Sequence, residues 1–310
     1  MKNQRRLYML NITLEDLRKE IENVEKITYE IAMRMRDLNR FESHKLFGTA
    51  YLAYLVAENG IADTKELIEY TEKELPIEQA LFVKESIGDS WSVAIDLGVS
   101  YTTEALAATL LWMPISNGKF GGEMETPECV AKLAAEILDI KNEKVADFCC
   151  GTGNFLRQAI EKNANAQYYG VEINTHCKEI AAIRLQLISD NALIEQRTVF
   201  EMEADKKFDK IFCDYPWNMK SYNISKEKMQ EYEAIIPEIR KLTNADWLFI
   251  LNTLQHLEQN GKAVVVTTNA TTWNVGLSKT IREKFVKEGW IEAVISLPAN
   301  LYQSISIPTT

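Results

Sequence analysis

The 310-residue sequence predicts an α/β protein in which an all-helical N-terminal domain precedes a doubly wound, mostly parallel sheet. Two observations predict this fold class. Over roughly the first 110 positions, apolar residues recur every three or four residues, which is typical of amphipathic helices. Beyond residue 117, short β-rich runs alternate with helical stretches, which is typical of a parallel sheet with helical crossovers. We place the predicted domains at 1–115 and 116–310.

The N-terminal region is predicted to contain helices only. The first spans 13–39, and Thr13, with Asp16 three residues later, has the character of an N-cap. The breaks between the later helices are expected at Asn59-Gly60, Pro76 and Gly98. These later helices are expected at 42–58, 63–74, 78–86 and 103–113.

The C-terminal region begins with a glycine-containing segment, Gly118 to Gly122, where the character of the sequence changes. Short runs that favour strands then alternate with helical patterns. We expect helices at 128–138, 155–161 and 246–259. We expect strands at 145–149, 168–172, 198–201, 210–214, 263–267 and 291–297.

Composition excludes several classes of protein. No run of eighteen or more apolar residues is present, and the basic residues within 1–8 are not followed by an apolar stretch, so we expect no membrane span and no secretory signal. The five cysteines show neither CxxC spacing nor a regular disulfide pattern; they are Cys129, Cys149, Cys150, Cys177 and Cys213. We therefore expect free thiols, no metal site and a cytoplasmic location.

The net charge of −10 is unfavourable for a protein that grips nucleic acid by itself. Affinity for nucleic acid depends mainly on Lys and Arg contacts to phosphates. Either the substrate is not nucleic acid, or another component supplies much of the binding.

The first motif is a predicted strand that runs into Gly151-Thr152-Gly153 and then into a helix. Glycines at such a turn let a ligand approach the backbone, and the helix N-terminus offers unpaired N–H groups. Glu172 closes the next strand about twenty residues later, where an acid can hold both ribose hydroxyls of a nucleoside. A P-loop is absent, and Leu156 replaces the third glycine of the dinucleotide fingerprint. We therefore favour an adenosine cofactor without a pyrophosphate over a purely structural turn.

This motif resembles motif I of class I S-adenosylmethionine-dependent methyltransferases, which implies their Rossmann-like fold and their cofactor. By that resemblance, Asp147 lies near the methionine amino group and Glu172 holds the ribose. Thr126-Pro127 resembles an element that closes over the methionine carboxylate. The implied cofactor-binding residues are Thr126, Pro127, Asp147, Cys150, Gly151, Gly153 and Glu172. The acid that contacts the adenine ring stays open among Glu201, Glu203 and Asp205.

The second motif, Asp214-Tyr215-Pro216-Trp217, follows directly from the predicted strand 210–214. An aromatic amine is a poor nucleophile, and it becomes cationic as a methyl group arrives. A carboxylate and a backbone carbonyl that accept both amine hydrogens favour that transition state, and Pro216 fixes the direction of the Tyr215 carbonyl. Trp217 is suited to stack on an extruded base. The alternative is an Asp-capped strand end with a packed Trp.

This tetrapeptide resembles motif IV of amino-methyltransferases, (D/N/S)PP(Y/F/W), with Tyr215 in place of the first proline. RNA adenine dimethyltransferases also carry a bulky residue at this position, so the match is weakened and not lost. The resemblance implies that Asp214, Tyr215, Pro216 and Trp217 are the catalytic residues. A 5-methylcytosine enzyme is not expected, because it needs a Pro-Cys nucleophile and Cys213 precedes Asp214.

Three further segments, DWLFI at 246–250, GKAVVV at 261–266 and IEAVISLP at 291–298, follow in order. Together with the first two motifs they resemble the modification subunits of type I restriction systems, which are N6-adenine DNA methyltransferases. The resemblance implies a double-stranded DNA substrate with a flipped adenine, a separate DNA-specificity subunit and a restriction subunit. A separate specificity subunit would ease the charge problem. Phosphate contacts or simple solvation remain open for Lys206, Lys207, Lys210, Lys220, Lys226 and Lys228.

Two other functions stay open. A protein glutamine N5-methyltransferase also acts on a planar NH₂ group with a similar motif IV, and a non-catalytic cofactor-binding module would tolerate Tyr215. The family's final strand and helices would follow Thr310, so we expect the catalytic domain to be shortened at its C-terminal end.

Overall fold

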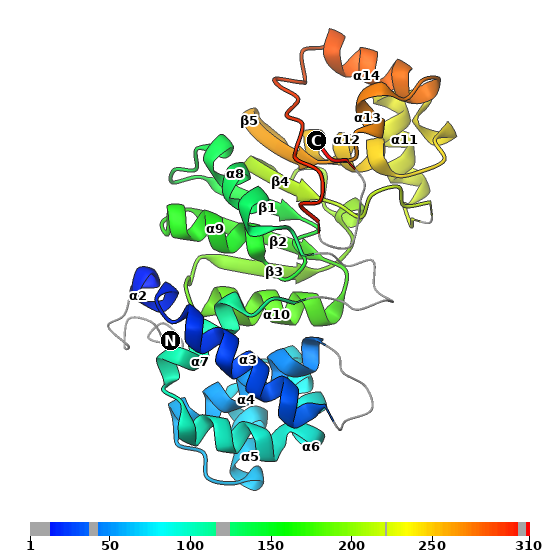
Figure 1. The fold of residues 1–310 in the computed structure, drawn as a ribbon. Helices are drawn as coiled ribbons and strands as arrows, with labels where there is room; N and C mark the ends of the chain where they lie inside the picture. Colours follow the sequence, from blue (N-terminus) through cyan, green and yellow to red (C-terminus); the bar gives the residue numbers. More distant parts are fainter. Residues whose placement is uncertain (1–12, 37–42, 116–124, 221, 303–307) are drawn as a thin grey trace. The chain divides into compact units, whose positions relative to one another are not determined.

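The structure is a computed structural model, and the chain divides into two compact units (Figure 1). Unit 1 contains Met1–Gly121 and Thr175–Asp190, and unit 2 contains Gly122–Asn174 and Asn191–Thr310. The glycine-containing segment 118–122 lies outside the part of the chain that the structure describes. The described residues are 13–36, 43–115, 125–220, 222–302 and 308–310.

Unit 1 is helical, as its apolar periodicity predicted. The N-cap at Thr13 is confirmed, since the Thr13 side chain accepts from the backbone N–H of Asp16 in a capping box. The expected single helix at 13–39 is wrong in one respect, because the helical pattern breaks at Lys19 and Glu20 into two helices. Its last three positions lie outside the described residues. The helices of unit 1 are α2 (Leu14–Arg18), α3 (Ile21–Met35), α4 (Ser43–Asn59), α5 (Thr64–Glu74), α6 (Ile77–Ser100), α7 (Thr103–Trp112) and α10 (Thr175–Gln186).

Helix α6 continues far beyond the expected end at residue 86 and passes through Gly98 without a break. The glycine stands inside the helix because α4 approaches closely at this position. A Cβ atom at position 98 would lie 2.8 Å from the carbonyl oxygen of Ala53 and 2.8 Å from Cγ1 of Val56. Gly98 is therefore a packing contact between two helices, and the expectation that it ends a helix was wrong.

Helix α10 is tied to the rest of unit 1 by a buried arginine. The Arg184 side chain is 1% exposed, and its Nε donates to the carbonyl oxygen of Leu110 at 3.0 Å. Its Nη2 donates to the carbonyl of Met113. These carbonyls belong to the C-terminal end of α7, where backbone acceptors lack partners within the helix and a cation is favoured.

Unit 2 is built on a parallel sheet, and the predicted α/β fold class is confirmed. In the described residues the sheet has five strands in the order β3-β2-β1-β4-β5, visible side by side in Figure 1. Every neighbouring pair is parallel, as expected for strands joined by helical crossovers. The strands are β1 (Lys144–Phe148), β2 (Gln167–Glu172), β3 (Ala192–Gln196), β4 (Phe208–Asp214) and β5 (Leu257–Val266).

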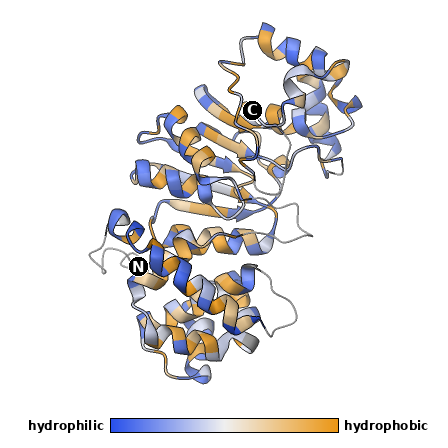
Figure 2. Ribbon diagram, in the orientation of Figure 1, coloured by the Kyte–Doolittle hydropathy of each residue, from blue (hydrophilic) through white to orange (hydrophobic). Residues whose placement is uncertain are grey.

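Apolar residues follow the strands and the facing sides of the helices in Figure 2. On one face of the sheet, Phe155 of α9 stacks on Phe212 of β4 with ring centroids 4.3 Å apart. On the other face, Phe148 and Val171 join the core that α12 covers. Among the described residues no helix combines the length and apolarity needed to span a membrane. The helices of unit 2 are α8 (Glu128–Leu138), α9 (Asn154–Lys162), α11 (Lys226–Ile235), α12 (Asp246–Gln255), α13 (Ala270–Trp273) and α14 (Leu277–Lys287), with 3₁₀ turns η1 (Val199–Glu201) and η2 (Ile239–Lys241).

Two predicted strands are wrong. The run 198–201 forms the 3₁₀ turn η1, because the Thr198 hydroxyl caps the turn and Val199 and Phe200 pack into the core; the third strand is β3, six residues earlier. The segment 291–297 is irregular, with Val294 58% exposed. A strand needs a neighbouring strand for its backbone groups, and in the described residues this segment has none.

We predict that Gly98→Ala lowers the free energy of unfolding by about 1–3 kcal/mol, because the new methyl group would overpack the contact with α4. Gly88→Ala is the matched control in the same helix. A Cβ at position 88 meets nothing within 4 Å, so this change should stabilise by about 0.5–1 kcal/mol. Urea unfolding followed by circular dichroism measures both. Equal stability of the two variants would contradict the observed packing of α4 on α6.

Candidate active site

The candidate site lies where β1, β2 and β4 end. Strand β1 pairs with β4 so that Phe148 lies opposite Cys213, and it pairs with β2 so that Phe148 lies opposite Val171. Because all three strands are parallel, the segments that follow them leave the sheet at one edge. The glycine loop after β1 and the motif that begins at Asp214 are therefore neighbours, as the sequence predicted.

The loop after β1 turns sharply at three residues with positive φ, namely Cys149 at 64°, Gly151 at 53° and Gly153 at 87°. The backbone N–H of Cys150 donates to the carbonyl oxygen of Val171 at 2.9 Å, which fixes the loop to β2. A Cβ on Gly151 would meet nothing within 4 Å, so the space beside its backbone is open. Gly153 then starts α9, whose first N–H groups have no partner within the helix.

Glu172 ends β2 and faces this loop. Its Oε2 accepts from the backbone N–H of Gly151 at 2.8 Å, and its Oε1 accepts from that of Asn174 at 2.8 Å. The carboxylate is buried and held by two fixed donors. A carboxylate oxygen can accept from more than one donor, so a group of this kind is suited to a ligand that carries two hydroxyls.

Asp147, in β1, is a buried acid whose hydrogen bonding is incomplete. Its side chain is 2% exposed, and Oδ1 has no hydrogen-bond partner in the described part of the chain. Burial, with the nearby Cys213, Asp214 and Glu172, raises the pKa of Asp147 well above its usual value. An unsatisfied buried acceptor costs about 1–3 kcal/mol, and such groups are concentrated at functional sites. A cationic donor would both pair with Asp147 and favour its ionised form.

Asp214 ends β4 and is the acceptor of two hydroxyl groups. Its Oδ2 accepts from Thr126 Oγ1 at 2.7 Å and from the Tyr302 hydroxyl at 2.7 Å. Among the described residues, no donor reaches Oδ1. Burial raises the pKa of Asp214 to about 6, while the two hydroxyl donors act in the opposite direction. The carboxyl group is therefore ionised near neutral pH and retains one oxygen as an acceptor.

The side chain of Tyr215 points into the core, so only its backbone is left near the carboxyl group of Asp214. The ring is 2% exposed and stacks on Phe249 with centroids 4.7 Å apart and planes 6° apart. Its hydroxyl lies 2.6 Å from Thr267 Oγ1. The departure from proline at this position thus fills the core beneath the motif.

Trp217 is held from two sides. Its Nε1 donates to the carbonyl oxygen of Val266 at 3.1 Å, which anchors the indole to the end of β5. The ring of Tyr302 meets it edge to face at 4.7 Å. Behind it, Asn218 has a φ of 56°, and its N–H donates to Asp246 Oδ1 at 2.7 Å, which turns the chain toward α12. Pro216, between the two aromatic residues, is exposed.

The Thr126-Pro127 element joins the two motifs. Pro127 precedes α8, and the carbonyl oxygen of Thr126 accepts from Asn154 Nδ2 at 3.0 Å. Thr152 of the glycine loop donates to Glu125 Oε1 at 2.5 Å. The Thr126 hydroxyl itself lies on Asp214, a contact that the sequence did not indicate. Sequence reasoning also missed Tyr302, although this residue lies just beyond the segment 291–298 that carries part of the family resemblance.

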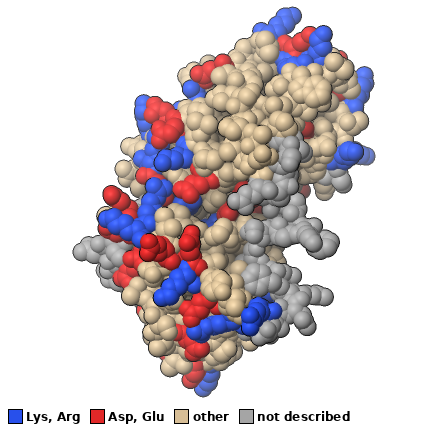
Figure 3. All heavy atoms as spheres, in the orientation of Figure 1, with Lys and Arg blue, Asp and Glu red and all other residues tan. Residues whose placement is uncertain are grey.

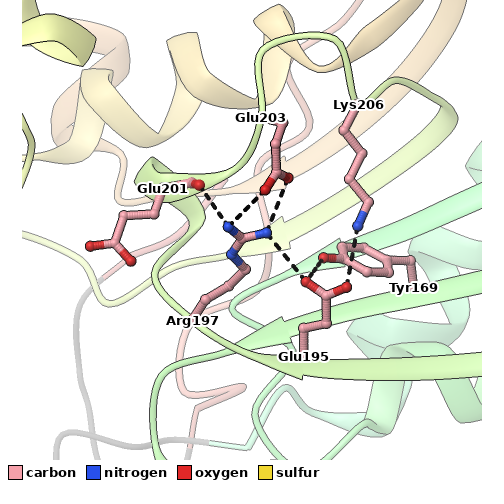
Figure 4. Close-up of polar contacts among 6 residues, drawn as sticks. All are labelled: Tyr169, Glu195, Arg197, Glu201, Glu203 and Lys206. Atoms are coloured by element: carbon pink, nitrogen blue, oxygen red, sulfur yellow. Dashed lines mark hydrogen bonds and ion pairs between the residues drawn. The ribbon is translucent and has the colours of Figure 1, made fainter.

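The three acids left open for an adenine ring are exposed, and one is already paired. Figure 4 shows Arg197 between Glu203, at 3.1 Å, and Glu195, at 3.3 Å, with the Glu201 carboxylate pointing away from the guanidinium. Lys206 adds an ion pair to Glu195 at 3.4 Å. The structure therefore identifies none of the three acids as the partner of an adenine ring. Glu203 belongs instead to an ion-pair cluster with Arg197 and Glu195 beside β3.

Acidic and basic side chains are intermixed on the face drawn in Figure 3. Four of the six lysines considered as phosphate contacts interact within unit 2. Lys206 pairs with Glu195, Lys207 donates to the carbonyl of Gln255, Lys210 pairs with Glu143, and Lys228 pairs with Glu231. These contacts favour a structural role for the four.

Comparison with known proteins gives consistent matches. The model of the family described as N-6 DNA Methylase matches residues 110–310. The methylase subunit of the type I restriction enzyme MpnII of Mycoplasma pneumoniae is 27% identical, over 97% of this chain and 56% of its own length. The methylase subunit of the type I restriction enzyme MjaVIII of Methanocaldococcus jannaschii is 29% identical, over 60% of this chain and 35% of its own length. The chain thus spans about half, or less, of these relatives.

A solved structure shares the fold. The methyltransferase subunit of the type I restriction-modification system of Streptococcus thermophilus superposes with a TM-score of 0.64 at 20% identity. The match covers 90% of this chain and 67% of that one. At this identity the likeness concerns the fold alone.

We predict that Asp147→Asn changes how stability depends on pH. Because the pKa of Asp147 is raised by folding, the wild-type protein loses stability as pH rises above about 4, where the unfolded carboxyl ionises. Above pH 4 the free energy of unfolding of the variant should rise relative to that of the wild type, by up to about 1.4 kcal/mol per pH unit, until the folded-state carboxyl also ionises. Urea unfolding at several pH values measures this. The exposed Asp205→Asn is the control, and a difference between wild type and Asp147→Asn that does not vary with pH would contradict the prediction.

Proposed function

Because the chain belongs to the N-6 DNA methylase family, we propose that it transfers a methyl group from S-adenosylmethionine to the N6 amine of an adenine turned out of a DNA duplex. One observation carries the proposal. At one edge of the sheet, an ionisable carboxyl with an available oxygen, Asp214 Oδ1, adjoins a glycine loop with open space beside its backbone. An acceptor for an amine thus lies beside a place for a nucleoside cofactor.

The cofactor is S-adenosylmethionine, and it supplies an activated methyl group on a sulfonium centre. The described residues fit it. The unsatisfied buried oxygen of Asp147 suits the cationic amino group of the methionine moiety, and Glu172 suits a pair of ribose hydroxyls. The backbone of Cys150, Gly151 and Gly153 would form the surface against which the cofactor is held. We assign the methionine carboxylate to the Thr126-Pro127 element, which is tied to the same loop.

The chain's own groups then act on the amine. Asp214 Oδ1 and the backbone carbonyl of Tyr215 accept its two hydrogens and stabilise the positive charge that develops on nitrogen. Pro216 restricts the backbone and so fixes the direction of that carbonyl. Trp217, anchored to β5, stacks on the flipped base, which offsets part of the few kcal/mol of unstacking.

The proposed partners rest on the names of the relatives and on the charge of the chain. The relatives are named as subunits of type I restriction enzymes, and a net charge of −10 limits how strongly this chain grips duplex DNA by itself. We propose that a DNA-specificity subunit supplies most of the binding and that a restriction subunit joins the same assembly. We also propose that the helical domain corresponds to 1–115 and the catalytic domain to 116–310, with α10 packing in unit 1. A cytoplasmic location accords with a DNA substrate.

We predict that the protein incorporates label from radioactive S-adenosylmethionine into adenine-containing DNA as N6-methyladenine. Asp214→Asn should lower the rate about a hundredfold, because a hydrogen bond involving a charged group is worth about 1.5–3 kcal/mol. Its affinity for the cofactor, measured by calorimetry, should stay within about threefold, since Asp214 is assigned to the amine. Asp209→Asn is the matched control in the same strand, where the carboxylate accepts from the N–H of Lys144 at 2.9 Å.

Other outcomes would contradict the proposed function. Label found only in peptide glutamine would indicate a protein methyltransferase, and no binding of the cofactor at high micromolar concentration would indicate a non-catalytic module. A full rate in Asp214→Asn would remove the carboxyl from the mechanism.

We also predict that methyl transfer falls on acidification with a midpoint near pH 6. The pKa of Asp214 is raised to about 6, so the group accepts the amine hydrogen above this pH and loses that ability below it. At pH 5 the rate should be about tenfold below its plateau. Single-turnover rates from pH 5 to 8, at saturating cofactor and DNA, measure the profile. The residual activity of Asp214→Asn should show no such midpoint.

A further inference from the structure

Tyr302 reaches the catalytic carboxyl from a distant part of the chain. It lies 88 residues beyond Asp214 in the sequence, and its side chain is only 5% exposed. The phenol donates to Asp214 Oδ2 at 2.7 Å, and the ring meets Trp217 edge to face at 4.7 Å. One side chain therefore contacts both the proposed amine acceptor and the proposed base platform.

The placement of two donors on one oxygen has a geometric consequence. The final torsion of an aspartate side chain is soft and two-fold, so an unrestrained carboxylate exchanges its two oxygens easily. Thr126 and Tyr302 both donate to Oδ2, and this fixes which oxygen is engaged. Oδ1 is thereby left as the acceptor for a substrate amine.

The surroundings keep Tyr302 in the state that this role needs. Burial and the adjacent Asp214 raise the pKa of Tyr302 far above its usual value, with a smaller contribution from Cys129 of α8, so the phenol stays a donor. Asp147 and Cys213, from β1 and β4, are the other titratable groups that interact with this acid cluster. The hydroxyl donors Thr126 and Tyr302 oppose the effect of burial on Asp214.

We propose that Tyr302 is a positioning residue for methyl transfer: its hydroxyl, together with that of Thr126, holds Oδ2 of Asp214 so that Oδ1 meets the adenine amine, while its ring supports Trp217. This inference rests on the proposed function and adds to it a residue outside both methyltransferase motifs. The ring without the hydroxyl would still pack on Trp217. The hydroxyl therefore has a separable effect.

The test compares Tyr302→Phe with Tyr232→Phe. Tyr232 is the matched control, because its buried hydroxyl donates to Asn252 Oδ1 at 2.8 Å, away from the acid cluster. Tyr302→Phe should slow single-turnover methyl transfer about tenfold or more, from the loss of a hydrogen bond to a charged group. It should also move the acidic midpoint of the pH profile upward, because a group that lowers the pKa of Asp214 is gone. Cofactor affinity should stay within about twofold, and Tyr232→Phe should match the wild type in all three measurements.

A second measurement does not depend on turnover. Carbon-13 NMR of labelled aspartate carboxyls, with Asp214→Asn to assign the signal, reports the pKa of Asp214 directly. We expect a higher value in Tyr302→Phe than in the wild type. In the wild-type protein alone, the ring signals of Tyr302 should follow the same midpoint as Asp214, which keeps the test available if the variant does not fold.

The results separate the two proposals. Absence of methyl transfer in the wild type would overturn the proposed function. The NMR titration would still show whether Tyr302 forms its hydrogen bond with Asp214. An unchanged rate and midpoint in folded Tyr302→Phe would overturn the inference. So would a faster rate, because it would mean that the phenol competes with the base for Asp214. Ring signals of Tyr302 that ignore the titration of Asp214 would overturn it as well.

Discussion

The parallel pairing of β1 with β4 is the constraint on which the site depends. It places the end of a glycine-bearing strand next to the end of an acid-bearing strand, although the two are more than sixty residues apart in the sequence. Neither motif has a chemical meaning alone. Side by side, they form the site for which we propose a backbone surface for a nucleoside and an acceptor for an amine.

The same edge collects acids in an unfavourable environment. Asp147, Glu172 and Asp214 approach one another in a region where burial raises the pKa of Asp147 and Asp214. Such an arrangement opposes folding, because buried carboxyls lose hydration and repel one another when ionised. A cationic ligand and an amine substrate would relieve both effects. Under the proposed function, the acids that would serve binding therefore lower the stability of the free protein.

Tyr215 shows how the protein accommodates a departure from the usual motif. Where the family pattern has proline, the tyrosine ring stacks on Phe249 and its hydroxyl pairs with Thr267. The side chain leaves the site, and the carbonyl is the part that remains. The following Pro216 is retained, and Trp217 is anchored by β5. The motif can therefore tolerate bulk at its second position if the core below has room for it.

The sequence by itself determined the helical first region, the parallel sheet and the two strand ends, because periodicity and glycine-containing turns are local properties. It did not determine the course of 198–201, where a strand-like composition forms a capped turn, nor the length of α6, since Gly98 serves a contact between helices. Only the tertiary structure brought Thr126 and Tyr302 to Asp214. Thr126 lies 88 positions before Asp214 and Tyr302 lies 88 positions after it. No local sequence pattern encodes a hydrogen bond between residues so far apart in the chain.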